Sequence, residues 1–428
     1  MQKVLIITYY WPPAGGPGVQ RWLNFVKYLR DFEIEPIVFI PKNAHYPLKD
    51  DSLLSEVPEG IQIISQPIFE PYGIASILSG KKTKRISSGI INDYKKQSFL
   101  ERLLLWIRGN LFIPDARKYW VKPSVKKLAD VIRKERIINI ITTGPPHSVH
   151  LIGKELKEQL GVRWIADFRD PWTTIGYHKK LKLSNSSKRK HESLEKAVLT
   201  TADDLIVTSN RTKGEFEKLT STPIKVITNG YDGNVEASTP DLKFSMAHIG
   251  SLLTGRNPET LWKALSSLLE ENEALRSSLE IRLIGAVGDG VIDSLNKYGL
   301  EEYTEIIGYV SHDQVLDYQT RAQLLLLLEI DSEDTKGIIP GKLFEYFKAR
   351  RPVVAIGPKN WEAGEMVEIH DAGHYLVHGD ATGIKELLLK RFEAFQAGKL
   401  DCESKGIEKY HRRNLTEKLA NLLTWESS

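Results

Sequence analysis

Two short polar loops in the first half of the sequence carry side chains suited to acid–base or phosphate chemistry. One loop reads Gly-Pro-Pro-His-Ser at residues 144–148, and the other reads Asp-Phe-Arg-Asp-Pro-Trp at residues 167–172. Together they offer His147, Arg169 and Asp170, which could orient a hydroxyl group, take its proton or clamp a phosphate. Because each loop follows an apolar, strand-like run and contains proline, we predict that these three residues form a catalytic group.

The second half of the sequence contains a run that looks superficially like a phosphate-binding loop. Residues 336–347 read Lys-Gly-Ile-Ile-Pro-Gly-Lys-Leu-Phe-Glu-Tyr-Phe. The spacing from Gly337 to Gly341 is one residue too short for an ATP-binding loop, and a leucine replaces its magnesium-binding Ser or Thr. What remains is a glycine before a helix start, which suits a diphosphate at Gly341 and Lys342. One turn further, Glu345 could accept hydrogen bonds from ribose hydroxyls.

Other glycine-bearing turns also follow strand-like runs and add candidate ligand contacts. The first turn of the chain contains Gly16, where glycine lets the backbone approach a ligand closely. A turn in the second half supplies Arg256, which could neutralise a phosphate. A later turn supplies the backbone of Tyr309 and Val310, which could contact the edge of a base. No set of histidines and carboxylates has convincing metal-ligand spacing, so we predict no metal site.

These residues need a scaffold, and the hydrophobic pattern predicts one. Near-continuous apolar runs alternate with helix-like stretches, which is typical of parallel sheets covered on both faces. Two such series in one chain predict an α/β fold with two doubly wound, Rossmann-like domains. The strand-like runs span residues 4–10, 36–40, 61–65, 138–143, 163–167, 205–209, 225–228, 246–250, 279–285, 305–308, 323–330, 352–356 and 374–377. The helix-like stretches include residues 21–29, 122–133, 150–160, 258–269, 291–295, 313–321 and 341–349.

A turn-rich stretch at residues 230–242 and a change in charge divide the chain. Residues 1–235 hold 37 Lys and Arg against 24 Asp and Glu, whereas the remainder holds 22 against 31. We predict an N-terminal domain at 1–235, a C-terminal domain at 236–405 and a final helical segment at 406–428. A basic half favours an anionic partner, such as a phosphate-bearing substrate or an anionic membrane surface, although solvated charge without a partner is the alternative.

Composition narrows the protein class and the compartment. Of the 428 residues, 41% are hydrophobic and 27% are charged, which excludes disordered and fibrous classes. A single cysteine, Cys402, excludes a disulfide framework. The longest apolar candidate for a membrane span is only five leucines at 324–328, and the N-terminus lacks the pattern of a signal peptide. We therefore expect a cytoplasmic protein.

Two further segments bear on a membrane partner. Residues 67–96 are irregular and basic, and we expect a loop there. Residues 99–112 follow directly and form an amphipathic pattern flanked by arginines, which could lie on a membrane surface. The alternative is a helix packed on its own domain. The basic half lacks a recognised nucleic-acid module, so we expect no nucleic-acid partner.

On these motifs the sequence resembles the retaining glycosyltransferases of the GT-B fold, in the large bacterial family that includes phosphatidylinositol mannosyltransferases. The resemblance covers nearly the whole chain. It rests on the first glycine-rich turn, on Asn-Gly-Tyr-Asp at 229–232, on the turn at 249–256 and on the run from Gly341 to Val354. The two polar loops of the first half are similar to a subgroup linked to surface polysaccharide synthesis.

The resemblance implies two Rossmann-like domains that face a cleft. It also implies a nucleotide-diphosphate-sugar donor in the C-terminal domain, a lipid-linked or glycan acceptor in the N-terminal domain, and no essential metal or separate cofactor. By position, Glu345 would bind the donor ribose, Gly341 and Lys342 the diphosphate, and Arg256 would balance its charge. The final helix, near residues 415–423, would return to the first domain.

The sequence departs from the family at Gly337, where the family often has the first of two glutamates eight residues apart. That glutamate usually lies near the sugar, so the sugar contacts are expected to differ. Ser251 stands where the family often has a basic residue, and the family's histidine falls near Gly144, with His147 three residues later. The phosphate clamp is therefore expected to depend on Arg256 and Lys342. Two other functions stay open on the same fold: a sugar-nucleotide epimerase, and a sugar-nucleotide-binding protein without catalysis.

Overall fold

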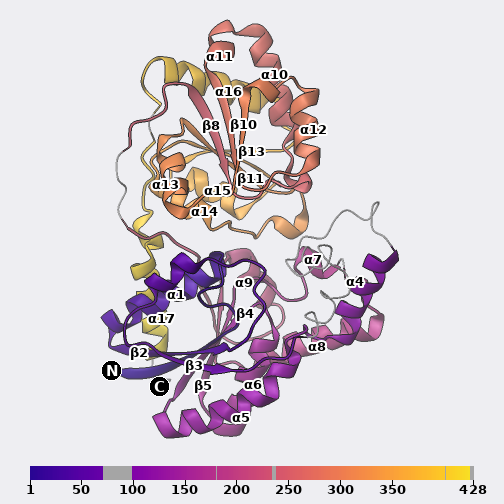
Figure 1. Cartoon of the computed structure of the whole chain (residues 1–428), viewed down its shortest axis with the longest axis vertical. Coiled ribbons are helices and arrows are strands. Elements are labelled where there is room, and N and C mark those ends of the chain that lie inside the picture. The colour runs from indigo at the N-terminus through magenta and orange to yellow at the C-terminus, as the bar shows by residue number, and fades with distance from the viewer. Residues whose placement is uncertain (71–98, 180, 234–237, 401, 425–428) are drawn as a thin grey trace. The chain divides into compact units, whose positions relative to one another are not determined.

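The computed structural model describes residues 1–70, 99–179, 181–233, 238–400 and 402–424 (Figure 1). The chain divides into two compact units. Unit 1 comprises residues 1–229 and 412–428, and unit 2 comprises residues 230–411. Most of the expected basic loop at 67–96 falls outside the described residues.

Unit 1 is built on a seven-stranded sheet in which all neighbouring strands are parallel. The strand order is β3-β2-β1-β4-β5-β6-β7, so the chain reverses direction across the sheet beside β1. This topology confirms the doubly wound prediction for the first half. The strands are β1 (Gln2–Thr8), β2 (Ile34–Pro41), β3 (Gln62–Gln66), β4 (Asn139–Gly144), β5 (Arg163–Phe168), β6 (Asp204–Val207) and β7 (Ile224–Val226).

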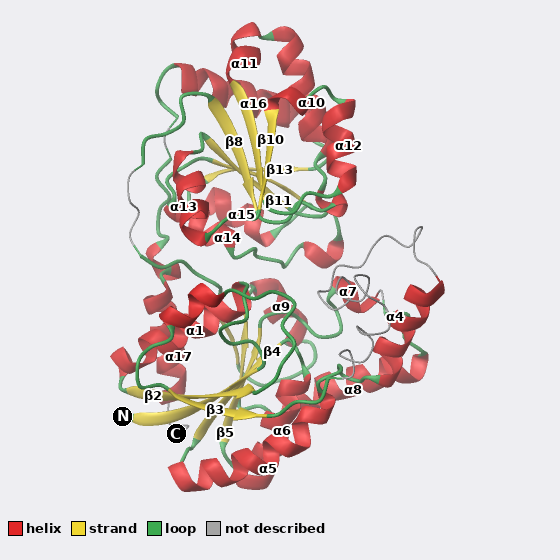
Figure 2. Ribbon diagram, viewed as in Figure 1, coloured by secondary structure: helices red, strands yellow, loops and turns green. Residues whose placement is uncertain are grey.

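Helices cover both faces of this sheet (Figure 2). Successive side chains of a strand point to opposite faces, so Leu5 and Ile7 enter one core, against α5, α6 and α8, whereas Val4 and Ile6 enter the other, against α1 and α17. The helices are α1 (Pro17–Leu29), α4 (Phe99–Leu111), α5 (Lys118–Glu135), α6 (Ser148–Leu160), α7 (Gly176–Lys179), α8 (Asn185–Thr201), α9 (Asn210–Phe216) and α17 (Arg412–Thr424).

The last helix, α17, packs in unit 1 although it follows unit 2 in the chain. Its buried leucines join the core that contains α1. Two polar side chains of the sheet satisfy carbonyls at its C-terminal end: Asn139 donates to Leu423 O at 3.1 Å, and Arg163 donates to Leu422 O at 2.6 Å. Carbonyls at a helix end lack partners within the helix, so these bonds fix where α17 ends.

Unit 2 repeats the architecture with a six-stranded parallel sheet in the order β10-β9-β8-β11-β12-β13. The apolar run at 323–330 becomes the central strand β11, all five of whose leucines are buried. The strands are β8 (Phe244–Ile249), β9 (Leu279–Ile284), β10 (Thr304–Gly308), β11 (Leu324–Leu328), β12 (Val353–Gly357) and β13 (Gly373–Val377).

Helices α10, α12 and α16 pack on one face of the unit 2 sheet, and α13, α14 and α15 pack on the other. The helices are α10 (Glu259–Glu271), α11 (Glu273–Ser278), α12 (Asp289–Lys297), α13 (His312–Arg321), α14 (Lys342–Lys348), α15 (Glu362–Ile369) and α16 (Ala381–Gln396). Among the described residues of both units, no helix is long and apolar enough to cross a bilayer.

Candidate functional site

The carboxyl ends of β8 and β11 are neighbours in the centre of the unit 2 sheet, where doubly wound folds bind ligands. Gly250 follows β8 and has a φ of 110°, a backbone conformation that residues other than glycine rarely adopt. This turn lies close to the first residue of α14. The Lys342 ammonium is 3.5 Å from the position that a Cβ of residue 250 would take, which is an ordinary contact distance. Two segments 90 residues apart in sequence therefore meet at this edge.

Lys342 is held in place by two hydrogen bonds. Its ammonium donates to Ile249 O at 2.8 Å and lies 3.2 Å from Nε2 of His248. His248 is fully buried, and its Nδ1 lies 3.1 Å from Leu326 O, which can only accept. The ring therefore donates through Nδ1 and accepts from Lys342 through Nε2. Burial, and then the charge of Lys342, keep the pKa of His248 well below its usual value, so the ring is neutral.

The charge of Lys342 is only partly compensated. Burial, and then repulsion from Arg256, lower the pKa of Lys342 to about 7, although the carboxylate of Glu329 acts in the opposite direction. Arg256 itself is paired with Glu329, with Nε to Oε1 at 2.9 Å and Nη2 to Oε2 at 3.3 Å. Glu329 has no exposed surface, whereas the Arg256 side chain is one-third exposed. Arg256 is thus paired with a carboxylate, whereas the ammonium of Lys342 bonds to a carbonyl and a neutral imidazole, which leaves its positive charge for an anion.

The start of α14 offers fewer free amide groups than the sequence suggested. The helix has only seven residues, and its Leu343 and Phe344 amides already donate to Pro340 O and Gly341 O. The attraction for an anion at Gly341 therefore comes chiefly from the side chains of Arg256 and Lys342 and not from the helix end.

Glu345 lies on α14, one turn after its start, and is partly exposed. Its Oε2 accepts from Nε2 of Gln319 at 3.0 Å, and Gln319 is itself buried on α13. This bond fixes the carboxylate while leaving acceptor capacity for a ligand hydroxyl.

Tyr309 and Val310 follow β10, the edge strand of the sheet. Tyr309 is 77% exposed, whereas Val310 packs partly against the core. β10 is two strands away from β8, which corresponds to roughly 10 Å at the usual strand spacing. The structure thus brings Lys342 and Arg256 together and leaves Tyr309 and Val310 at a distance that a ligand would have to span.

In unit 1, the predicted polar loops meet the first glycine-rich turn. Arg169 donates from Nε to Gly144 O at 3.2 Å and from Nη2 to Pro145 O. A Cβ at Gly18 would lie 1.4 Å from Nη1 of Arg169, so a side chain at this position would displace the guanidinium. Gly16 caps α1 with a φ of 106° and supplies no side-chain cap. The guanidinium of Arg169 thus lies beside the start of α1.

His147 is nearly buried, with 5% of its surface exposed, and its ring stacks on Trp172 with centroids 4.8 Å apart. Both ring nitrogens are buried without a hydrogen-bond partner. Burial, and then the charge of His150, hold the pKa of His147 well below its usual value. Burial raises the pKa of Asp170, and Arg169 partly offsets this effect. Of the three predicted catalytic residues, Arg169 and Asp170 are partly exposed.

Asp167, the other carboxylate of the second loop, has a structural role. It is fully buried and accepts from Arg21 at 2.9 Å, from the Trp22 indole at 2.9 Å and from Thr143 at 2.8 Å. These bonds join α1, β4 and β5. The carboxylate has no exposed surface for a substrate.

Sequence reasoning missed three residues that support the unit 2 site: His248, Glu329 and Gln319. His248 stands two residues before Gly250, and Glu329 follows the five leucines of β11, so each was visible as a polar residue at a strand end. Among the described residues, no group of three or more His, Cys, Asp or Glu side chains could hold a metal ion.

No protein-family model matches the sequence, and no curated protein matches it either. Solved structures do match in fold. A glycosyltransferase from Rickettsia africae has a TM-score of 0.61 at 14% identity, over 100% of both chains. Anabaena HepE, crystallised with UDP, has a TM-score of 0.58 at 14% identity, over 98% of this chain and 95% of that one.

A putative UDP-N-acetylglucosamine 2-epimerase from Listeria monocytogenes matches with a TM-score of 0.56 at 10% identity, over 98% of this chain and 95% of that one. At these identities the matches establish the GT-B fold and not the reaction. The fold expected from the resemblance is confirmed. Because a transferase and an epimerase share it, the chemistry must be argued from the site.

Proposed function

We propose that this protein is a glycosyltransferase that moves a sugar from a nucleotide-diphosphate-sugar donor to a lipid-linked or glycan acceptor. The observation that carries the proposal is the buried ammonium of Lys342, which lies near the Arg256–Glu329 ion pair at the carboxyl edge of the unit 2 sheet and bonds to a carbonyl and an imidazole. A diphosphate would supply the missing negative charge there. The UDP complex of Anabaena HepE supports a nucleotide in a protein of this fold.

In this proposal unit 2 holds the donor. Lys342 and the backbone at Gly341 bind the diphosphate, and Glu345 accepts hydrogen bonds from the ribose. The backbone at Tyr309 and Val310 contacts the base. Glu329 and His248 touch no ligand, but they orient Arg256 and Lys342.

Unit 1 holds the acceptor, with the partly exposed Arg169 and Asp170 as the residues closest to its hydroxyl and His147, whose ring nitrogens are buried, packed behind them. Gly16 lies at the start of α1, where a negatively charged group is favoured. In a retaining reaction the leaving phosphate can itself take the proton of the acceptor. Stabilising the charge of that phosphate then contributes most to catalysis, and a protein base contributes less.

The finer terms of the proposal follow from the resemblance. The enzyme would retain the configuration of the sugar, would need no metal, and would act in cell-surface polysaccharide synthesis. It would work in the cytoplasm, at the inner face of the plasma membrane, as a peripheral protein.

Thermal unfolding with nucleoside diphosphates tests the donor site. The protein is heated with UDP, GDP, dTDP, CDP or ADP, each without added metal. A ligand present at 100 times its dissociation constant stabilises the fold by about 2.7 kcal/mol, which gives a clear rise in melting temperature. We expect one diphosphate to give this rise and Glu345→Ala to remove it. Glu259→Ala, an exposed glutamate at the start of α10, is the matched control and should keep the rise.

No stabilisation by any diphosphate at millimolar concentration would contradict the donor site. If a diphosphate binds, assays with the matching sugar nucleotide separate the alternatives. Conversion of that sugar nucleotide without an acceptor would indicate an epimerase, and binding without turnover would indicate a non-catalytic protein.

A further inference from the structure

Helix α4 exposes several apolar side chains. A helix that packs only on its own domain normally buries them. Leu103, Trp106 and Leu111 are 42%, 44% and 54% exposed, whereas Leu105 and Gly109 are buried. Trp106 lies three residues after Leu103, and Leu111 lies eight residues, about two turns, after it, so both share a side of the helix with Leu103. In a helix at the surface of a soluble domain, that outward face is normally polar.

The last turn of α4 is attached to the chain that precedes α8. A Cβ at Gly109 would lie 2.6 Å from Leu183 and 2.8 Å from Leu181 O, which shows how closely the chain before α8 approaches. Asn110 accepts from the Ser184 amide at 2.8 Å and donates to Lys182 O at 3.3 Å. Asn110 lies four residues after Trp106, on the same side of the helix, so these contacts fix the last turn of α4 against the chain before α8.

The apolar surface continues beyond the helix. Tyr119 and Phe69 are 49% and 58% exposed, and their rings make an edge-on contact with centroids 5.9 Å apart. Lys118 joins this surface to the end of α4, because its ammonium donates to Leu111 O at 2.7 Å and lies 5.2 Å from the Tyr119 ring. We define the α4 patch as Leu103, Trp106, Leu111, Tyr119 and Phe69.

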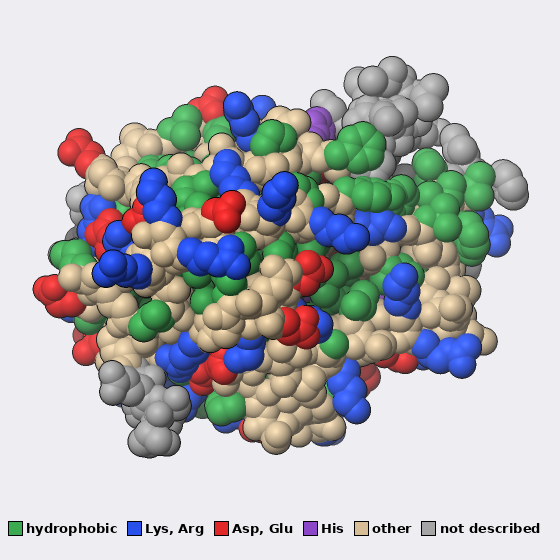
Figure 3. Space-filling view, turned by 90° about the horizontal axis from the view of Figure 1, so that it is seen from below, with side chains coloured by type: hydrophobic (Ala, Val, Ile, Leu, Met, Phe, Trp, Pro, Cys, Tyr) green, Lys and Arg blue, Asp and Glu red, His purple; other side chains and the backbone are tan. Residues whose placement is uncertain are grey.

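Basic side chains border the patch from two directions. On α5, Lys118, Lys122 and Lys126 recur every four residues, and residues 116–129 contain no acidic residue. At the start of α8, which is bonded to Asn110, Lys188, Arg189 and Lys190 are exposed, and residues 171–191 contain no acidic residue. On the side of the molecule where Figure 1 places α4, Figure 3 shows hydrophobic side chains gathered with Lys and Arg side chains around them.

We infer that the α4 patch docks on an anionic lipid surface. An amphipathic helix lies in a membrane interface when its apolar face enters the acyl boundary and basic residues meet anionic headgroups. A tryptophan suits that depth. A second copy of this chain would fit less well, since the basic borders would repel each other. This inference rests on the proposed function, because the docking would bring unit 1 to a lipid-linked acceptor.

Trp106 gives a direct readout. The other tryptophans of the described residues are buried, so Trp106 alone among them is accessible to a quencher in lipid. The full-length protein is mixed with vesicles of phosphatidylcholine, with or without 30% phosphatidylglycerol, and bound protein is measured by flotation. We expect binding only with phosphatidylglycerol, a loss of binding at high salt, and quenching by brominated lipid. Trp106→Phe should keep the binding and lose most of the quenching.

Removing apolar area should weaken docking without unfolding the protein. The double variant Leu103→Ser, Leu111→Ser should bind vesicles at least about tenfold more weakly, because two half-exposed leucines no longer enter the lipid. Ile369→Ser is the matched control in unit 2, since Ile369 is 72% exposed, and its binding should not change. Lys122→Ser with Lys126→Ser should lower the preference for phosphatidylglycerol.

Two results would overturn the inference: no binding of the wild type to vesicles with phosphatidylglycerol, or equal binding of the Leu103→Ser, Leu111→Ser variant. A wild-type dimer that this variant converts to a monomer would assign the patch to a second copy instead. Nucleoside diphosphate binding is measured on the same preparation. A protein that binds the nucleotide but not the vesicles contradicts only this inference, and the reverse contradicts only the proposed function.

Discussion

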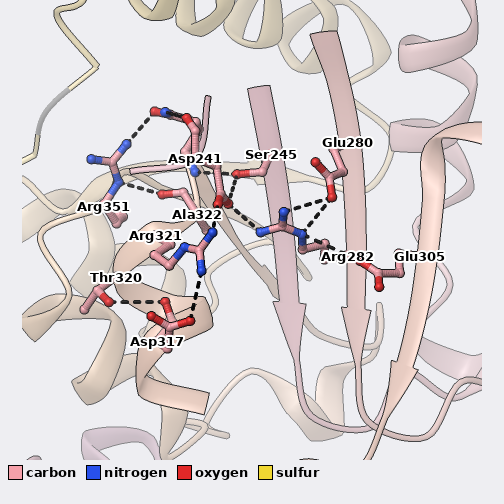
Figure 4. A network of polar contacts seen from close by, with 11 residues as sticks. Asp241, Ser245, Glu280, Arg282, Glu305, Asp317, Thr320, Arg321, Ala322 and Arg351 are labelled. Carbon is pink, nitrogen blue, oxygen red and sulfur yellow. Dashed lines mark hydrogen bonds and ion pairs between the residues drawn. The ribbon is translucent and has the colours of Figure 1, made fainter. Parts of the chain in front are cut away.

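The two ends of the unit 2 sheet differ in how the charges of their basic side chains are compensated. In its amino-terminal half, Asp241 accepts from Ser245 at 2.8 Å, pairs with Arg282 and lies 3.2 Å from Arg321 (Figure 4). Arg282 also pairs with Glu280 at 2.9 Å. At the carboxyl end, Arg256 pairs with Glu329, and the two hydrogen bonds that Lys342 makes among described residues involve a carbonyl and an imidazole.

The difference separates a structural network from a binding surface. Around Asp241 every arginine of the network faces a carboxylate or a carbonyl, so nothing is gained by adding a ligand. Burial, and then repulsion from Arg256, lower the pKa of Lys342, and its ammonium bonds to a carbonyl and an imidazole, so an incoming anion is favourable. Substitutions at the two ends should therefore have opposite effects on stability and on nucleotide binding.

The largest effect should come from Asp241→Ala. It leaves Arg282 and Arg321 without their shared partner, and we expect a loss of about 3 kcal/mol in the free energy of unfolding, the lower end for a broken buried ion pair because Arg282 keeps Glu280. Urea denaturation measures this loss. The nucleotide affinity of the folded variant should be unchanged.

Asp317→Ala is the matched control at the same end. Asp317 pairs with Arg321 at 3.4 Å, but its side chain is 53% exposed. Exposed pairs contribute little, so this variant should lose less than about 1 kcal/mol. Equal losses of stability for the two variants would mean that the ion pairs of Asp241 do not stabilise the fold more than an exposed ion pair does.

Lys342→Met should show the reverse pattern. It removes a charged hydrogen bond to the diphosphate, so affinity for the best nucleoside diphosphate should fall about 10- to 100-fold in titration calorimetry. Stability of the free protein should not fall, since an undercompensated charge is removed. Lys348, on the same helix, donates instead to Asp232 O. The variant Lys348→Met is therefore the matched control and should keep wild-type nucleotide affinity. A Lys342→Met variant with wild-type affinity would place the diphosphate elsewhere.

The pH dependence should isolate the same lysine. With its pKa lowered to about 7 from an ordinary 10.5, Lys342 loses its proton in the folded protein while the unfolded chain keeps it. Between these values the unfolded state binds more protons, so Lys342 makes stability rise with pH across this window. Nucleotide binding needs the charged form and should weaken above pH 7, by up to about tenfold per unit. Both slopes should be absent in Lys342→Met.

The fold could be predicted from sequence because each strand carries its own signal. Every strand of the described sheets overlaps one of the predicted apolar runs, and β11 is recognisable from its five leucines alone. Helix α8 escaped prediction because its first turns are Ser, Lys and Arg, with apolar residues only toward its end. Its amphipathic pattern is too weak to be recognised without the sheet on which it packs.

The site could be predicted only at the level of loops. Residue type and position indicated Lys342, Arg256 and Glu345, but the partners that tune them are distant in sequence. His248 lies 94 residues before Lys342, and they meet only because β8 and β11 are neighbours. The same limit hid the role of Asp167, whose partner Arg21 lies 146 residues earlier. Sequence spacing does not reveal which carboxylate is already neutralised.

The smallest effect should come from His248→Leu, which tests whether His248 acts only through Lys342. Losing the Nε2 acceptor frees the ammonium to move, but Lys342 keeps its bond to Ile249 O. Because the ammonium stays near the diphosphate, we expect about a 2- to 10-fold loss of nucleotide affinity, less than for Lys342→Met. Leu326 O also loses its partner, so stability falls whatever the role of the ring, and affinity must be measured on folded protein.

The double variant His248→Leu, Lys342→Met separates the two roles of His248. If the histidine only positions the lysine, the double variant should bind nucleotide no more weakly than Lys342→Met alone, because the ring then has no lysine to hold. Additive losses would instead mean that His248 supports the site through the backbone of β8. In that case the excess charge at the carboxyl end, and not the position of one ammonium, would account for the difference between the two ends of the sheet.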